Sequence, residues 1–268
     1  MPYPWRSALF RGTFWGLILL AHLALVTYFY PVFLEQQGSL LKFARQMGGV
    51  FNSLADVSTK SDWAFFSSQQ LSKLGNVLGV AMATLFAVGA VAGEAHRGSL
   101  EIVLARPRSR TRILLERYAA GGLALMVPVW VTTPMVMPLA EQMGIVAQMQ
   151  EKFDSDFHLP TELLVRGAIH EGFFLLSIYS VTFLLSCFAS RVEWIVIGVL
   201  GASLVLGALY LVPVTTDYSP FRYADPMVYL EFESEPGLPW KITGSLIGVS
   251  LGCLALSWLA FRRRLPNH

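Results

Sequence analysis

The sequence predicts an all-α integral membrane protein in which six helices cross the bilayer. The 268-residue chain is 54% hydrophobic and only 14% charged, whereas a soluble domain carries roughly 25% charged residues. Six runs of about twenty residues are nearly free of charge, and each is long enough to cross about 30 Å of hydrocarbon as a helix. Two cysteines are too few to stabilise a chain of this length as a secreted, disulfide-bonded scaffold.

The expected spans follow one another with connections of very different length. They cover residues 13–34, 74–93, 118–140, 172–190, 194–214 and 242–261. The first run is too long for the apolar part of a cleaved signal peptide, and no small-residue cleavage site follows it. We therefore expect one transmembrane domain over residues 1–268, with residues 1–12 as a separate segment before the first span.

Charge indicates the orientation of the six spans. The termini and the connections between the second and third and the fourth and fifth spans hold twelve of the twenty basic residues and four acids. The opposite set holds eight basic residues and fourteen acids. Because Lys and Arg in short loops stay on the cytoplasmic side, we expect both termini inside, in the cytoplasmic (inner) membrane.

Several kinds of chemistry have no motif in this chain. No G-x-x-x-x-G-K-[ST] sequence occurs, so a nucleotide would have to be bound by another polypeptide. His170-Glu171 resembles the start of a zinc-protease motif, but Phe174 stands where the second histidine belongs. A net charge of +2 does not indicate a nucleic-acid partner. We expect no cofactor, no metal and no catalytic residue in the chain itself.

Residues within the spans suggest helix packing more than transport chemistry. His22 lies well inside the first span, where a neutral histidine bonded to a neighbouring helix is favoured over a proton relay. Small residues recur every four positions, which allows close helix approach, and we favour contacts within the chain over a subunit interface. These stripes are Gly75, Gly79, Ala83 and Ala87 in the second span and Gly244, Gly248 and Gly252 in the last. Prolines 128, 134 and 138 predict a kinked third span.

The connection between the second and third spans, GEAHRGSLEIVLARPRSRTRILLERY from Gly93, is the most informative stretch. Ser99 can begin a short helix with an apolar edge, and Pro107 ends it. Ser109 can cap the following helix, in which Arg112 and Glu116 pair four residues apart. A solvated loop or a clamp for lipid headgroups is the simpler alternative, but neither accounts for an apolar edge facing water.

This stretch resembles the motif of type 2 ABC transporter permeases. The family pattern is Gly-Glu, two variable residues, Arg/Lys-Gly-Thr/Ser-Leu-Glu, a Leu-Leu pair, and then Pro-x-Ser-Arg before the third helix. The residues that match in order are Gly93, Glu94, Arg97, Gly98, Ser99, Leu100, Glu101, Pro107, Ser109 and Arg110. The sequence departs at Val103, where Leu is frequent, and at Ser99 and Arg117, where Thr and Lys are commoner.

The resemblance implies a cytoplasmic coupling helix over residues 94–110 that docks into a groove of a separate ATP-binding subunit. It implies that residues 1–12 form an interface helix along the cytoplasmic leaflet, with Trp5, Arg6, Phe10 and Arg11. The residues expected to take part in ATPase docking are Glu94, Arg97, Gly98, Leu100, Glu101, Val103, Leu104, Arg106, Pro107 and Arg110. ATP and magnesium would be bound by that ATPase, in two copies.

By the same resemblance, the chain is expected to act as the permease subunit of an exporter, paired with a second permease copy or a paralogue and embedded in membrane lipid. Two alternatives remain. A related membrane subunit could serve the maturation or assembly of an extracytoplasmic enzyme or machinery, or anchor an ATPase without transport. Less favoured is an intramembrane enzyme that uses His22, His170 or Glu171.

Overall fold

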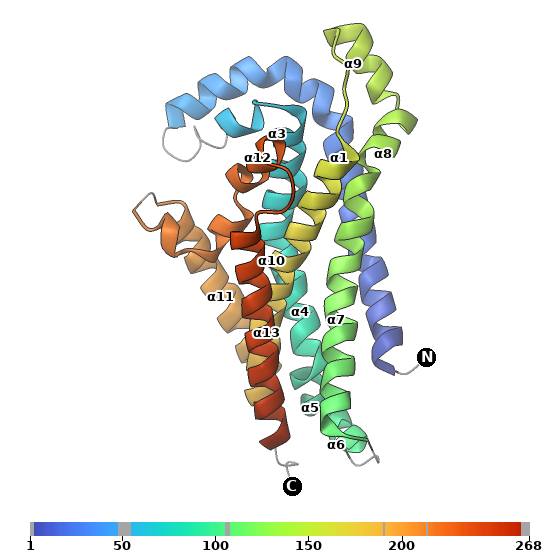
Figure 1. Ribbon diagram of the computed structural model, residues 1–268, viewed down its shortest axis with the longest axis vertical. Helices are drawn as coiled ribbons and strands as arrows, with labels where there is room; N and C mark the ends of the chain where they lie inside the picture. The colour runs from blue at the N-terminus through green and yellow to red at the C-terminus, as the bar shows by residue number, and fades with distance from the viewer. Residues whose placement is uncertain (1–2, 48–54, 105–107, 190, 213, 264–268) are drawn as a thin grey trace.

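The computed structural model describes residues 3–47, 55–104, 108–189, 191–212 and 214–263. Every regular element in these ranges is helical, and six segments are long and apolar enough to cross a membrane (Figure 1). The segments are Pro4–Met47, Asp62–Ala90, Arg110–Gln142, Thr161–Phe188, Val192–Tyr210 and Trp240–Arg263. The chain is therefore a multi-pass membrane protein with the predicted number of spans.

Besides the first segment, which is described below, three of these segments are single helices and two are composite. The single helices are α10 (Thr161–Phe188), α11 (Val192–Tyr210) and α13 (Trp240–Arg263). The second segment joins α3 (Asp62–Phe66), two π-helical stretches (Ser67–Lys73 and Gly75–Gly79) and α4 (Val80–Ala90). The third joins α7 (Arg110–Thr132), a 3₁₀ turn (Thr133–Met135) and α8 (Val136–Gln142). The shorter helices are α5 (Ala92–His96), α6 (Ser99–Leu104), α9 (Ile145–Phe153), α12 (Pro226–Ser234) and two 3₁₀ turns, Thr216–Tyr218 and Pro220–Ala224.

The 3₁₀ turn that interrupts the third span lies at the prolines that predict a kink there. Pro128 is inside α7, Pro134 is in the turn itself and Pro138 is in α8. Proline lacks the amide hydrogen that an α-helix needs four residues along, so the backbone tightens locally. A 3₁₀ turn therefore lies within the third span at these prolines, and the kink itself stays a prediction.

The first helix differs from its expected division into an interface segment and a span. The single helix α1 (Tyr3–Met47) contains residues 3–12 without a break, and they continue the direction of the first span (Figure 1). Pro4 lies in the first turn, where its missing amide hydrogen costs nothing, and the next proline is Pro31. Nothing between these positions stops the helix.

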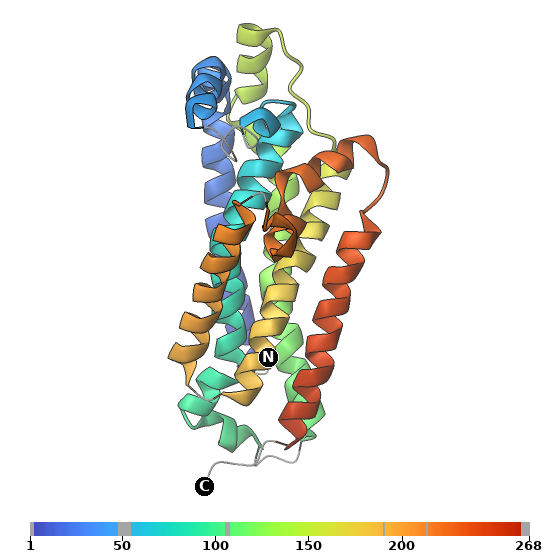
Figure 2. The same ribbon diagram turned by 90° about the vertical axis from the view of Figure 1, so that its left-hand side faces the viewer.

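The centre of the bundle is α10, which packs against α4, α7 and α13 (Figures 1 and 2). Large aromatic side chains such as Phe174, Tyr179 and Phe183 on α10 are fully buried. In contrast, α11 leaves most of its surface on the outside of the bundle, with Ile195 as its buried residue. Figure 2 shows α11 and α13 standing apart on either side of α10.

The two stripes of small residues have different surroundings. A side chain at Gly75 would collide with the Glu171 carboxyl, and one at Gly79 would lie 2.7 Å from Leu175, both on α10. The first stripe therefore packs within the chain, as predicted. At Gly244, Gly248 and Gly252 an added side chain would meet no atom within 4 Å. The expectation that this second stripe packs within the chain is wrong, because α13 turns its Thr243, Ser250 and Ser257 face inward instead.

The helices α5 and α6 lie at the end of the bundle where α1 begins and α13 ends (Figure 1). The opposite end carries α9, α12 and the last turns of α1, which bend over the bundle (Figure 1). The two ends are therefore structurally distinct, and the candidate site lies at the end that holds both terminal helices.

Candidate functional site

The connection between the second and third spans folds into two short helices, α5 and α6. Gly98 separates them with φ +69°, a left-handed conformation that glycine adopts without strain. The Ser99 hydroxyl donates a 3.2 Å hydrogen bond to the Glu94 carbonyl, so α6 folds back toward α5. The short helix predicted to begin at Ser99 is present over Ser99–Leu104.

A buried ion pair anchors this connection to the bundle. The Arg117 guanidinium on α7 donates to the Glu94 carboxylate on α5, and both side chains are less than 10% exposed. Arg117 also donates to the carbonyl of Ala90 at the end of α4. Because a buried charge without its partner is costly, the pair fixes α5 relative to both neighbouring spans.

The apolar edge of α6 is divided between the bundle and the outside. Leu100 is 2% exposed and belongs to the central hydrophobic core, whereas Ile102 is 65% exposed. Arg97, on the turn before α6, is exposed as well. The side chains of Glu101, Val103 and Leu104 and the whole of Arg106 and Pro107 lie outside the described part of the structure. Thus Leu100 holds α6 to the bundle, and Ile102 presents an apolar surface.

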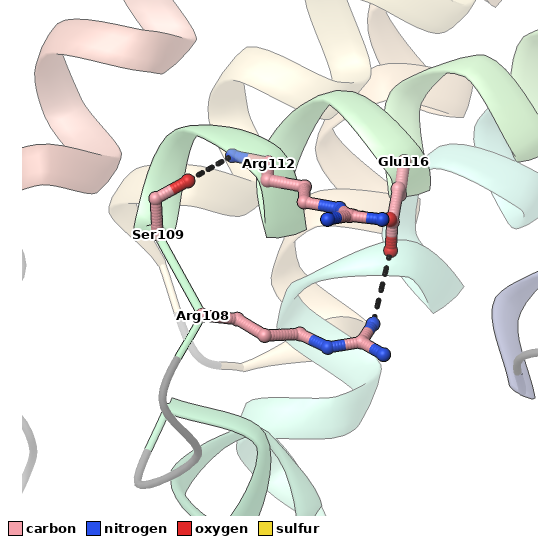
Figure 3. A network of polar contacts seen from close by, with 4 residues as sticks. All are labelled: Arg108, Ser109, Arg112 and Glu116. Carbon is pink, nitrogen blue, oxygen red and sulfur yellow. Dashed lines mark hydrogen bonds and ion pairs between the residues drawn. The ribbon is translucent and has the colours of Figure 1, made fainter.

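The start of α7 is fixed by a small polar network (Figure 3). The Ser109 hydroxyl accepts a hydrogen bond from the Arg112 amide and caps the helix as predicted. The Glu116 carboxylate pairs with Arg112 at 2.9 Å, again as predicted, and with Arg108 at 3.6 Å. These groups are partly exposed, so the pairs add little stability but orient two arginines beside α6.

Contacts between α7 and α13 complete the positioning of this end. Arg110 donates to the carbonyl of Arg262 at 3.3 Å, and the Trp258 indole donates to the Thr111 hydroxyl at 2.9 Å. The Arg262 guanidinium lies 4.7 Å from the centre of the Trp258 ring. The connection that contains α6 is therefore held to the bundle at both ends, by α5 on one side and by the start of α7 on the other.

The residues expected in the interface segment lie on the first turns of α1. Phe10 is 77% exposed and Arg6 is exposed, while Trp5 and Arg11 are half-buried. Arg11 faces α4, with its guanidinium 6.0 Å from the centre of the Phe86 ring. Arg11, Glu94 and Arg117 line one small cavity, whereas Phe10 does not line it. The structure therefore brings Arg11 close to the Glu94–Arg117 pair.

The histidines and the acid that an intramembrane enzyme would use have structural hydrogen-bond partners. His22 bonds to Gln70 at 2.7 Å, which confirms the expected bond to a neighbouring helix. His170 bonds to the Thr243 hydroxyl at 2.8 Å and to the Tyr223 carbonyl at 2.7 Å.

Glu171 is fully buried and accepts a 2.6 Å hydrogen bond from the Tyr229 hydroxyl. Burial, followed by the neighbouring Glu171 carboxyl, raises the pKa of Tyr229 well above its usual value, so the phenol remains a donor. Glu171 therefore connects α10 to α12, and His170 connects α10 to the segments on either side of α12. Among the residues that the structure describes, no three His, Cys, Asp or Glu side chains form a group able to hold a metal ion.

Two features of this end were not predicted from the sequence. The pairing of Glu94 with Arg117 joins residues 23 positions apart and depends on how α4 and α7 pack. The exposed Ile102 lies between residues that were expected to form the apolar edge. A helical-wheel reading of the six residues of α6 could not separate the buried face from the outer face.

The fold and this end of the molecule define a class of protein: a six-span helical membrane domain with a short, bundle-anchored pair of helices between its second and third spans. Residues 5–264 match the family described as ABC-2 family transporter protein, and the chain belongs to this family. It is a permease subunit of an ABC transporter, and the family works with an ABC ATPase. No curated protein matches the chain in sequence.

Proposed function

We propose that this permease is part of an exporter in which α5 and α6 dock onto a separate ATPase at the cytoplasmic face. The supporting observation is the construction of that segment: Ile102 and Arg97 are exposed, while Leu100 is buried in the core and the Glu94–Arg117 pair fastens the segment to both neighbouring spans. A docking surface needs an apolar contact that excludes water and nearby charges that fix its register.

The predicted docking residues have two proposed roles: some contact the ATPase and others hold the docking segment in place. Ile102 and Arg97 contact the ATPase, together with Glu101, Val103, Leu104, Arg106 and Pro107. Glu94, Gly98, Leu100 and Arg110 act from within the protein by holding the segment in place. Because Glu94 pairs with α7 and Leu100 reaches the core, movement of the docked segment would be passed directly to the spans.

The complete transporter would contain two permease chains, either identical or paralogous, and two ATPase subunits that bind ATP and magnesium. With the short, arginine-rich connections inside, both termini lie in the cytoplasm of the cell, and the bundle spans the inner membrane. The predominantly apolar spans favour an amphipathic, lipid-like or drug-like cargo over a small ion. The export direction rests on the same family resemblance.

The docking proposal is tested by affinity purification of the tagged chain in mild detergent with its partner. We expect an ABC ATPase to co-elute with the unaltered protein and to be lost, by about tenfold or more, with Ile102→Asp. A buried interface tolerates a desolvated carboxylate poorly, at a cost of several kcal/mol. Leu104→Asp and Glu101→Arg should weaken the complex in the same direction.

The matched control is Val214→Asp, which places the same charge on a side chain that is 85% exposed at the opposite end. This variant should keep its ATPase, and both variants should melt at the same temperature as the parent. Equal ATPase recovery with Ile102→Asp and Val214→Asp would contradict docking through α6.

Whether the complex moves cargo is a separate question, because a subunit for assembly of extracytoplasmic machinery would dock an ATPase through the same segment. The outer end carries α9, α12 and the last turns of α1, where Phe43 is 60% exposed. ATP-dependent accumulation of a fluorescent amphipathic dye in inverted vesicles supports export. ATPase turnover without any cargo movement supports the assembly role.

A further inference from the structure

A small, positively charged cavity opens between α1, α4 and α7 beside the anchor of α5. It measures about 30 Å³ and is lined by Arg11, Arg97 and Arg117 together with one acid, Glu94. Glu94 pairs with Arg117, so two positive charges remain. Among the residues that the structure describes, the guanidinium groups of Arg11 and Arg97 have no carboxylate partner.

Arg11 is held in this cavity by the shape of α4. Its guanidinium lies against Gly89, where an added side chain would be only 2.8 Å from Nη1, and 6.0 Å from the centre of the Phe86 ring. Because the half-buried Arg11 cannot be fully hydrated there, an anion would be a better partner than bulk water. The cavity thus has the charge of an anion site, with Arg11 packed in place as a donor.

An apolar groove between α1 and α7 adjoins the cavity. Ala8, Ala120 and Ala124 line both spaces, which makes them neighbours. The groove measures about 330 Å³, within the usual range of about 300–1,000 Å³ for ligand sites. Its walls run along the membrane-spanning parts of both helices and include Trp5, Leu9, Gly12, Gly16, Leu123, Val127, Pro128 and Val131.

The groove opens sideways, toward the position of the bilayer. Leu9 is 55% exposed and Val131 is 57% exposed, and both line it. It lies beside the closest approach of the two helices, where Gly12 meets the backbone of Ala124. At Gly16, an added side chain would meet only Pro128, at 3.5 Å, so the groove has room there.

We propose that this cavity and groove together bind one anionic phospholipid, with its phosphate between Arg11 and Arg97 and an acyl chain between α1 and α7. A single molecule with an anionic head and an apolar tail satisfies both halves of the site, which neither a free anion nor an uncharged lipid does. The lipid comes from the leaflet at the α5–α6 end; that this leaflet is cytoplasmic rests on the proposed orientation.

The site has a consequence for the docking segment. Glu94 and Arg97 line the cavity and also belong to α5 and the turn that precedes α6. A bound phosphate would therefore contact the turn that leads into α6, the helix that presents Ile102, so the lipid would stabilise the arrangement in which that segment is held.

The experiment uses the purified full chain in mild detergent, without any ATPase, so its result is independent of the docking proposal. The probes are phosphatidylglycerol and phosphatidylcholine with identical brominated acyl chains, and inorganic phosphate. Trp5 lines the groove, so a bromine atom on a bound chain should quench its fluorescence, and Trp5→Phe should remove that part of the signal. The dissociation constant is measured from the quenching.

We expect phosphatidylglycerol to bind at least about tenfold more tightly than phosphatidylcholine, and Arg11→Gln to remove that difference. The matched control is Arg6→Gln, the same change on the same helix at an exposed position that lines neither space; it should alter binding less than about twofold. Gly16→Leu should fill the groove and reduce quenching while leaving the melting temperature unchanged.

Three results would overturn the proposal. Equal weakening by Arg11→Gln and Arg6→Gln would mean that only the overall charge of the helix matters. Inorganic phosphate competing at the same concentration as the lipid would indicate a site for a free anion. Disulfide cross-linking between two copies through Leu9→Cys, with no lipid quenching, would show that a second chain occupies the groove.

Discussion

The two glycine stripes show how one sequence pattern can lie in opposite environments. Gly75 and Gly79 are pressed against α10, where no side chain larger than hydrogen fits without displacing Glu171 or Leu175. Gly244, Gly248 and Gly252 have the same four-residue spacing, yet nothing lies within 4 Å of the positions their side chains would take. Spacing therefore indicates that a helix can be approached closely, but not whether another helix of the same chain does so.

The difference comes from the other residues through which each helix contacts α10. On α13, Thr243 bonds to His170, and Ser250 and Ser257 follow it at seven-residue intervals on the buried face. Thr243 thus makes a hydrogen-bonded contact with α10, whereas the Ser250 and Ser257 hydroxyls donate to carbonyls of α13 itself. This small polar face is turned inward, which leaves the glycines on the outer side. On the second span, Gly75 lies where the Glu171 carboxyl fits.

The largest effect that tests this comparison should come from Gly75→Val. Its side chain would collide with a fully buried carboxyl that a hydrogen bond to Tyr229 holds in place, so we expect a loss of about 3 kcal/mol in the free energy of unfolding. The measurement is reversible unfolding in detergent micelles. A loss below about 0.5 kcal/mol would mean that the π-helical stretch Gly75–Gly79 and α10 are less tightly packed than described.

An intermediate effect is expected from Tyr229→Phe, which leaves the buried Glu171 carboxyl without its donor. Losing such a partner costs about 1–3 kcal/mol. The matched control is Tyr218→Phe, because Tyr218 is 79% exposed and should tolerate the change with no measurable loss. Equal stability of the two variants would show that the hydrogen bond does not hold Glu171 against the glycine stripe.

The smallest effect should come from Gly248→Val on α13. The structure places no atom near the new side chain, so the isolated chain should lose less than about 0.5 kcal/mol of stability. Native mass spectrometry of the same variant sharpens the comparison: loss of a dimer at unchanged monomer stability would identify this stripe as a subunit contact. A loss above about 1 kcal/mol in the monomer would place it inside the chain.

Hydropathy located all six apolar helices, and several of these helices extend beyond the span bounds predicted from it. The second span was expected from residue 74, and the helical segment that contains it begins at Asp62, with Ser67, Ser68 and Gln70 buried inside the protein. The fourth was expected from residue 172, and its helix begins at Thr161, with the polar Arg166, His170 and Glu171 inside the bundle. A scale that measures transfer into lipid cannot recognise helix turns whose polar groups bond within the protein.

The candidate site was predictable where interactions are local and not where they join distant segments. The Ser109 cap and the Arg112–Glu116 pair lie within four residues of each other and follow from helix geometry. The Glu94–Arg117 pair and the burial of Leu100 depend on the packing of whole spans, so no local pattern reveals them.

The central claim, that α6 contacts an ATPase, is tested most directly by site-specific cross-linking. A cysteine-directed photo-cross-linker on Ile102→Cys, in a background with Cys187 and Cys253 replaced by Ala, should capture one partner in native membranes, a protein with an ABC nucleotide-binding motif. The same reagent on Val214→Cys should not capture it. Capture of that ATPase from position 214, or no nucleotide-binding partner at position 102, would contradict the account.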